Sequence, residues 1–121
     1  MQKNLFLLLT CAGLAIPALA EMPKAVNGKL IDEDGRTLYV FDKDTVAGKS
    51  ACEGGCAANW PAALADSYDK AGPHWGFVTS ADGKRQWAYK GKPLYLWVND
   101  KKPGDRTGDG FRGGIWHLAK P

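Results

Sequence analysis

Histidine and cysteine are scarce in this chain of 121 residues, which has only two histidines and three cysteines. An excess of one charge sign is also lacking, because 16 basic and 13 acidic residues leave a formal net charge of +3. A nearly neutral surface with both signs interspersed gives no reason to expect nucleic acid or an anionic membrane as a partner. Neither a glycine-flanked nucleophilic serine nor a phosphate-binding glycine loop is present, so we expect a protein that is not an enzyme.

Long apolar runs are missing except for one at the N-terminus, over residues 5–16. This run follows a single positive charge at Lys3 and is too short to cross the core of a bilayer stably. It is followed by Ala18-Leu19-Ala20, the small-x-small pattern that a signal peptidase recognises. These features predict a secretory signal peptide over residues 1–20.

Cleavage between Ala20 and Glu21 would leave residues 21–121, a length typical of one domain, with no transmembrane segment. We therefore expect a single domain in the periplasm or outside the cell. The alternative is a lipoprotein signal, in which Cys11 would become the lipid-anchored N-terminus.

Two cysteines, Cys52 and Cys56, would remain after cleavage. An even number of cysteines in an exported protein predicts a disulfide, here a local clip contributing about 2 kcal/mol because the loop is short. Redox activity or copper handling is the alternative, although thioredoxin-type pairs have two intervening residues and this pair has three. The histidines His74 and His117 could complete a Cys₂His₂ metal set, but the spacing follows no compact zinc pattern.

Helical periodicity is rare, and short apolar segments alternate with glycine-containing turns. A helix is expected only near residues 57–60, where Pro61 would end it, with a short turn over residues 62–65. The sequence thus predicts a mostly β fold, a small single domain of two related hairpin or meander units with long loops. The expected strands are residues 29–32, 36–41, 76–79, 85–89, 93–97 and 115–118.

An internal repeat is the most informative feature, because residues 35–44 match residues 91–100 position by position. Within each copy, a tyrosine and a second aromatic residue point to one face of the strand, and aliphatic residues point to the other. Both faces are apolar, which predicts central strands covered on both sides. The two units, near residues 28–44 and 76–100, are expected to form a pseudo-symmetric pair with one shared core.

Each unit carries the motif Tyr-x-aromatic-x-x-Asp, whose aspartate we expect to accept backbone N–H groups and fix the following turn. Together with residues 52–61 and 113–117, these motifs resemble the bacterial secreted repeat family of unknown function, predicted lipoproteins with a Tyr-x-(Phe/Trp/Tyr)-x-x-Asp motif. The resemblance covers essentially the whole chain after the signal. It implies export and a repeat architecture but no chemistry. The motif residues are Tyr39, Phe41 and Asp44, and then Tyr95, Trp97 and Asp100.

Asp105, Thr107 and Asp109 are the candidate metal ligands, because oxygen-bearing side chains at alternate positions before Gly110 resemble the start of a calcium loop. The twelfth position of that loop, where a glutamate is required, holds Trp116. Aspartate and glycine are also the residues of ordinary turns, so the alternative is a loop without calcium.

The five tryptophans could form a stacking platform for a sugar, haem or another flat ligand, but aromatic residues at strand spacing more often form the core. We expect core, with Trp75 and Tyr68 in a loop as the exceptions. The function we expect is a non-catalytic binding or interaction module for a small molecule or an envelope protein, without a cofactor. The alternatives are a redox or copper-handling accessory protein and a calcium-stabilised structural module.

Overall fold

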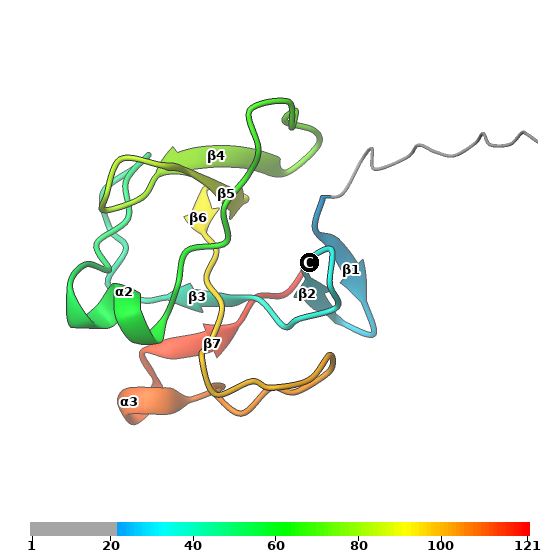
Figure 1. The fold of residues 1–121 in the computed structure, drawn as a ribbon, viewed down its shortest axis with the longest axis vertical. Coiled ribbons are helices and arrows are strands. Elements are labelled where there is room, and N and C mark those ends of the chain that lie inside the picture. Colours follow the sequence, from blue (N-terminus) through cyan, green and yellow to red (C-terminus); the bar gives the residue numbers. More distant parts are fainter. Residues whose placement is uncertain (1–21) are drawn as a thin grey trace, which may run out of the picture.

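Three small antiparallel sheets joined by long loops form the fold of the structure, a computed structural model that describes residues 22–121 (Figure 1). The first pairs β1 (Lys24–Val26) with β2 (Lys29–Ile31), and the second pairs β3 (Tyr39–Phe41) with β7 (Trp116–Leu118). The third has the order β4 (Trp75–Thr79), β5 (Arg85–Tyr89) and β6 (Lys92–Pro93). The mostly β, single-domain fold predicted from the sequence is confirmed. The predicted signal peptide, its cleavage point and Cys11 lie outside the described residues.

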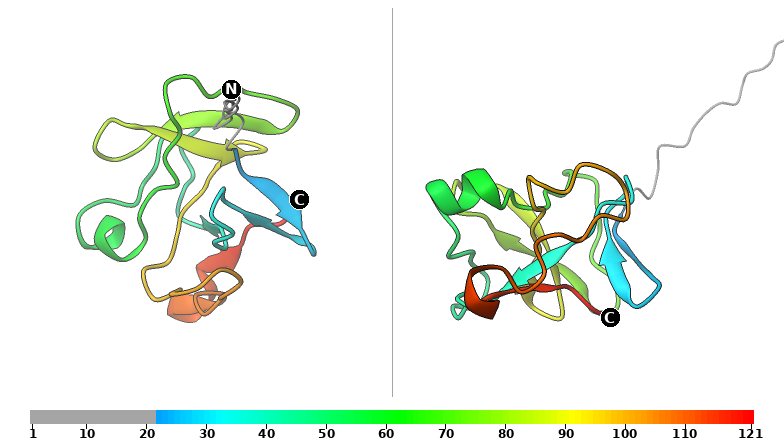
Figure 2. Two further views of the ribbon diagram at one scale, coloured as in Figure 1. Left: turned by 45° about the vertical axis from the view of Figure 1, so that its right-hand side comes forward. Right: turned by 90° about the horizontal axis from the view of Figure 1, so that it is seen from below.

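Two short helices complete the described part of the chain, α2 (Gly55–Asn59) and α3 (Phe111–Gly114). Both lie at one end of the molecule, away from the β1–β2 hairpin, as the views in Figures 1 and 2 agree. The helix α2 begins earlier than predicted and ends before Pro61. The helix α3 is irregular, because Arg112 and Gly113 have positive φ angles inside it.

The two repeats meet at an approximate twofold axis between Tyr39 and Tyr95, which hold the same position in the two motifs. Their backbones exchange two hydrogen bonds, from Tyr39 N to Tyr95 O at 2.9 Å and from Tyr95 N to Tyr39 O at 3.0 Å. On the outer side, Tyr39 pairs with Leu118 and Tyr95 forms a bridge with Ala62. We call the separation along the chain between Tyr39 and Tyr95 the repeat offset. The same offset separates Ala62 from Leu118, so it relates the outer partners as well.

Two clusters of buried side chains flank this central pair of strands. Tyr39 and Tyr95 belong to the first cluster, which is rich in aromatic rings. Leu38 and Leu94 belong to the second, which is more aliphatic. The prediction that both faces are covered is therefore confirmed, but the repeats share two cores instead of one. The strand predicted over residues 93–97 is shorter, because β6 ends at Pro93 and only Tyr95 forms bridges beyond it.

The pairing of the first predicted hairpin differs from the expectation. Only the Ile31–Thr37 bridge joins its two arms, and the main partner of β2 is β1. The strand β3 does not pair with β2, because its two edges are already paired with β7 and with Tyr95.

The segment expected to form a turn over residues 62–65 is instead extended. Ala62 forms a bridge to Tyr95, and Leu64 forms a bridge to Gln86. Its backbone groups are thereby used by strands that are distant in sequence, which a local turn pattern does not reveal.

Candidate functional site

The two family motifs are joined across the twofold axis by their side chains. The Tyr39 hydroxyl donates to Asp100 Oδ2 at 2.7 Å, and the Tyr95 hydroxyl donates to Asp44 Oδ2 at 2.6 Å. Each tyrosine therefore binds the aspartate of the other repeat and not the one in its own motif. This exchange ties the repeats together, which gives the motif a structural role.

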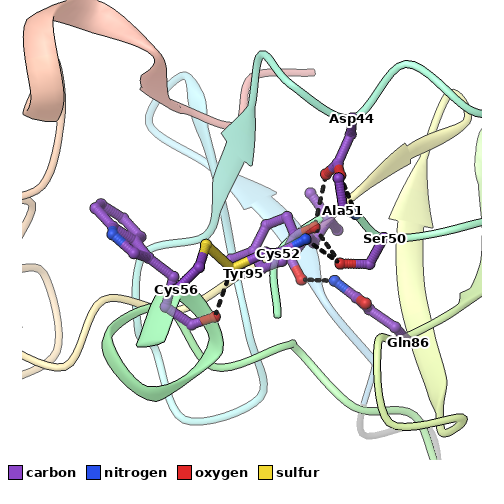
Figure 3. The surroundings of a disulfide bond; sticks show 9 residues. Asp44, Ser50, Ala51, Cys52, Cys56, Gln86 and Tyr95 are labelled. Atoms are coloured by element: carbon purple, nitrogen blue, oxygen red, sulfur yellow. Dashed lines mark hydrogen bonds between the residues drawn. A yellow bond between two sulfur atoms is a disulfide. The ribbon is translucent and has the colours of Figure 1, made fainter. Parts of the chain in front are cut away.

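The second oxygen of each aspartate holds the loop that follows it. Asp44 Oδ1 accepts the Ala51 amide at 2.7 Å, as Figure 3 shows. Asp100 Oδ1 accepts the Thr107 amide at 2.9 Å and the Thr107 hydroxyl at 2.8 Å. Ala51 and Thr107 are again related by the repeat offset. The expectation that both aspartates accept backbone N–H groups is confirmed, whereas the exchange between repeats was not predicted.

Burial keeps both phenols protonated. Loss of solvent raises the pKa of Tyr39 and of Tyr95, and the hydrogen bond to a carboxylate raises each pKa further. Burial also raises the pKa of Asp44, against the opposing effect of its hydrogen bonds from Tyr95 and Ala51. The hydroxyls consequently act as hydrogen-bond donors at neutral pH, because a phenol with a raised pKa keeps its proton there.

The raised tyrosine pKa values predict alkaline destabilisation. Above pH 10.0, the ordinary tyrosine pKa, unfolded chains lose the two protons that the folded protein still holds. The free energy of unfolding should then fall by about 1.4 kcal/mol per pH unit for each tyrosine. The double variant Y39F/Y95F should be less stable at pH 7 but show a shallower decline between about pH 10 and 11, measured by urea unfolding. An equally steep decline in this variant would contradict the assignment.

Four aromatic rings stack in a row across the same axis. Phe41 lies 4.2 Å from Trp116, Trp116 lies 3.8 Å from Trp60, and Trp60 lies 4.2 Å from Trp97, as distances between ring centroids. The repeat offset relates Trp60 to Trp116 and Phe41 to Trp97. The expectation that these tryptophans form core is confirmed. The equivalence of Trp60 and Trp116 was missed, although the constant repeat offset could have revealed it.

The exceptions expected among the aromatic residues are only partly found. Tyr68 is 61% exposed. Trp75 lies in β4 and not in a loop, and it packs against Trp87 and Tyr89.

Gly108 is the point at which the chain approaches this stack most closely. A Cβ atom there would lie 2.6 Å from Trp60 Cη2 and 3.0 Å from Trp97 Cγ, and neither ring has room to move within the stack. Gly108→Ala should therefore lower the free energy of unfolding by about 1–3 kcal/mol. The control Gly76→Ala meets nothing within 4 Å and should change it by less than about 0.5 kcal/mol. Equal effects of the two substitutions in urea unfolding would contradict this packing.

The predicted disulfide between Cys52 and Cys56 is present, with its Cα atoms 5.2 Å apart. The units expected near residues 28–44 and 76–100 would leave it in the loop between them, but it lies inside the first repeat. The repeat offset places Gly108 and Arg112 at the corresponding positions of the second repeat. The disulfide is thus a feature of one repeat only, and it breaks the symmetry at α2.

A groove of about 470 Å³ lies over the ring stack, lined by residues from α2 and α3. Its lining residues form five pairs, and in each pair the two members are related by the repeat offset. The pairs are Phe41 and Trp97, Gly55 and Phe111, Cys56 and Arg112, Asn59 and Ile115, and Trp60 and Trp116. This groove on the twofold axis is the candidate functional site.

A second cavity, of about 440 Å³, lies on the other side of the disulfide, where Cys52 lines it. Its lining includes the polar side chains of Ser50, Tyr95 and Asp82. Tyr95 and Ser50 are already bonded to each other at 2.7 Å, so they are engaged in holding the loop (Figure 3). We therefore favour the aromatic groove as the site.

The three calcium candidates do not converge on one point. Asp105 accepts two backbone amides of its own loop, Thr107 donates to Asp100, and Asp109 accepts the Leu118 amide at 3.1 Å. Each of the three side chains thus holds the chain through at least one hydrogen bond. Among residues 22–121, no group of three or more histidine, cysteine, aspartate or glutamate side chains is placed to hold a metal ion.

The two histidines belong to different elements of the structure. His117 lies in β7 and bonds Asp42 at 2.8 Å, and His74 lies in the loop before β4. The Cys₂His₂ set considered from the sequence is not assembled, because the cysteines are joined to each other.

Comparison with known proteins agrees with the repeat. A family model described as a secreted repeat of unknown function matches residues 24–64 and again residues 76–120. Each match contains one Tyr-x-aromatic-x-x-Asp motif and one tryptophan of the central stacked pair. No curated protein and no solved structure is significantly similar to the chain. In the described part, neither helix is long and apolar enough to span a membrane. Because the two matches cover most of the sequence, the chain belongs to this family of secreted repeats of unknown function.

Proposed function

We propose that this protein is an exported, non-catalytic binding module whose two repeats together form one ligand site, the groove between α2 and α3. The signal peptide over residues 1–20 is removed after Ala20, and residues 21–121 act as a soluble domain in the periplasm or outside the cell. Membership of a secreted family supports this location, and so does a disulfide, which requires an oxidising compartment. A lipid anchor on Cys11 is the alternative.

The proposal is based on the groove-lining positions at which the two repeats differ. At the floor of the groove, two of the five pairs have an aromatic ring in both repeats. These pairs are Phe41 with Trp97, and Trp60 with Trp116. In the three remaining pairs, which form its walls, the residue of the second repeat belongs to a different chemical class from the residue of the first. Packing alone explains the shared floor, because it is the core of the domain. The changed walls are consistent with selection for a ligand.

The groove suits binding better than catalysis. Its volume falls in the range of small-molecule sites, and its lining combines aromatic rings with polar groups. Only one of the lining side chains, Arg112, carries a charge. Acid–base chemistry needs at least one titratable group positioned near its substrate, and an arginine, always protonated, does not serve.

Native mass spectrometry of the protein purified from the envelope of its host tests the proposal. We expect a mass above that of the chain beginning at Glu21, lost on denaturation. The extra mass should be absent from the variant Phe111→Ser and retained in Tyr68→Ser, because Phe111 lines the groove while Tyr68 is exposed elsewhere. A wild-type protein without bound mass, or one equally loaded in both variants, would contradict the site.

The same spectrum tests the location and the disulfide. A denatured chain beginning at Glu21 and lighter than its reduced form by two hydrogen atoms is expected. A chain beginning at Cys11 with acyl groups attached would instead support the lipid anchor.

A redox role is the second candidate, favoured by one observation: Cys56 lines the groove, so its sulfur lies where a partner would dock. Equilibration with glutathione measures the reduction potential of the Cys52–Cys56 bond. A value below about −300 mV would leave the bridge structural, whereas a value near −120 to −180 mV, as in periplasmic and endoplasmic oxidants, would support redox activity.

A further inference from the structure

We infer that the ligand of this groove is a planar aromatic or heteroaromatic molecule bearing an anionic group, held by the ring surfaces of the groove and by the Arg112 guanidinium. This inference rests on the proposed function and adds the chemical class of the ligand to it.

The charge of the groove selects for an anion. Arg112 is the only ionisable side chain among the lining residues, and no carboxylate lines the groove to neutralise it. Arg112 is exposed, and its guanidinium makes no hydrogen bond or ion pair with residues 22–121, so it is free to contact a ligand. A planar guanidinium with five donors forms strong two-point hydrogen bonds with carboxylate, sulfonate or phosphate groups.

The backbone at Arg112 gives further support. Arg112 has a φ angle of +58°, in the left-handed region that favours glycine, and the next two residues are glycines with positive φ. A glycine at this position would relieve the strain at no steric cost. Asn27, His74 and Lys90 also have positive φ and lie outside the groove, so the angle supports the inference only together with the position of Arg112 in the groove lining.

The shape and the aromatic content of the groove select for a flat ring. Phe111 is 39% exposed at the mouth and packs against Trp97 and Trp60, with ring centroids 4.7 Å and 5.8 Å apart. Trp60 and Trp116 each have both ring faces covered by stacked neighbours, so only their ring edges can meet a ligand. An aromatic ligand can therefore lie against the Phe111 face while meeting tryptophan edges, the two arrangements that ring quadrupoles favour.

A matched pair of probes tests this class, using the whole protein without its signal peptide. The probes 1-naphthalenesulfonate and 1-naphthylmethylammonium share one ring system and differ in the sign of the charge. Binding is followed by NMR of the five tryptophan indole N–H signals. We expect the signals of Trp60, Trp97 and Trp116 to shift with the sulfonate, while those of Trp75 and Trp87, in the other cluster, stay in place.

Variants at the arginine identify the anion contact. We expect the sulfonate to bind about tenfold more tightly than the ammonium probe. Arg112→Gly, whose backbone accepts the positive φ, should bring the two affinities together, and Arg112→Lys should retain part of the difference. The control Arg106→Gln removes an exposed arginine outside the groove and should change nothing.

Equal affinity for the two probes, or an unchanged preference in Arg112→Gly, would overturn the inference about the anion. Shifts of Trp75 and Trp87 alone, or no shift at all, would overturn the class of ligand. Neither result would touch the proposed function, since that fails only if the native protein carries no ligand or if Phe111→Ser carries it as well as Tyr68→Ser does.

Discussion

Replacing Asp100 with asparagine is expected to lower the free energy of unfolding by about 2–3 kcal/mol, and the same change at Asp44 by about 1 kcal/mol or less. The two residues occupy equivalent positions, so the difference arises from their neighbours. Asp100 is only 5% exposed and accepts three hydrogen bonds, two from Thr107 and one from Tyr39. Urea unfolding at pH 7 measures the effect.

The reason lies in the proton of each tyrosine. Tyr39 Oη already accepts the Gly108 amide, so its own proton needs an acceptor, which Asp100 Oδ2 supplies. An asparagine amide turned toward Tyr39 is a donor and removes that acceptor. Turned the other way, the same amide faces the donors of Thr107. Either orientation leaves a buried donor without an acceptor, which is costly.

An asparagine at position 44 leaves no buried donor without an acceptor. Tyr95 Oη lies 2.7 Å from Ser50 Oγ, so it can donate to the serine and accept from an asparagine amide at position 44. The asparagine oxygen still accepts the Ala51 amide. Because burial raises the pKa of Asp44, a neutral replacement also removes a desolvation cost. The exposed turn residue Asp34 is the control, and Asp34→Asn should have little effect. Equal losses at positions 44 and 100 would contradict this account.

Removing either central tryptophan should have the largest effect of all. Trp60→Ala and Trp116→Ala each delete a ring from the middle of the four-ring stack, where Trp60 is 3% and Trp116 is 2% exposed. Truncating a buried tryptophan costs about 3–5 kcal/mol, a large part of the total stability of a domain of this size. Tyr68→Ala, at an exposed aromatic residue, should cost less than about 0.5 kcal/mol.

The stack also predicts how the protein unfolds. Each central tryptophan comes from a different repeat, and each tyrosine binds the aspartate of the other repeat. The repeats should therefore unfold together, with one transition seen alike by tryptophan fluorescence and by far-ultraviolet circular dichroism. If Trp116→Ala instead produced two separate transitions with the first repeat still folded, the interlocking of the repeats would be wrong.

Local patterns in the sequence were sufficient for several features. Short apolar segments between turns predicted the strands and also that Tyr39 and Leu38 would lie on opposite faces, because side chains alternate across any strand. The even number of cysteines expected after the signal predicted the Cys52–Cys56 disulfide. The turn over residues 62–65 was wrong, since its extended form depends on Tyr95 and Gln86, far away along the chain.

The candidate site was less accessible from the sequence. The calcium pattern at Asp105, Thr107 and Asp109 reflects turn chemistry, in which aspartates bind backbone amides. The groove and its charged residue, Arg112, were not predicted, because a single arginine beside glycines forms no recognisable motif. Only the repeat offset, applied beyond the Tyr-x-aromatic-x-x-Asp motif, would have aligned Cys56 with Arg112.

The sequence by itself determined the mostly β class, the repeat, the faces of the central strands and the cysteine pair, since each depends on residues close together in the chain. The tertiary structure decided which aspartate each tyrosine binds, that Trp60 stacks on Trp116, and that residues of both repeats line one groove. Those features depend on how two distant segments pack. Packing is set by the fit of whole surfaces, which residue spacing alone does not encode.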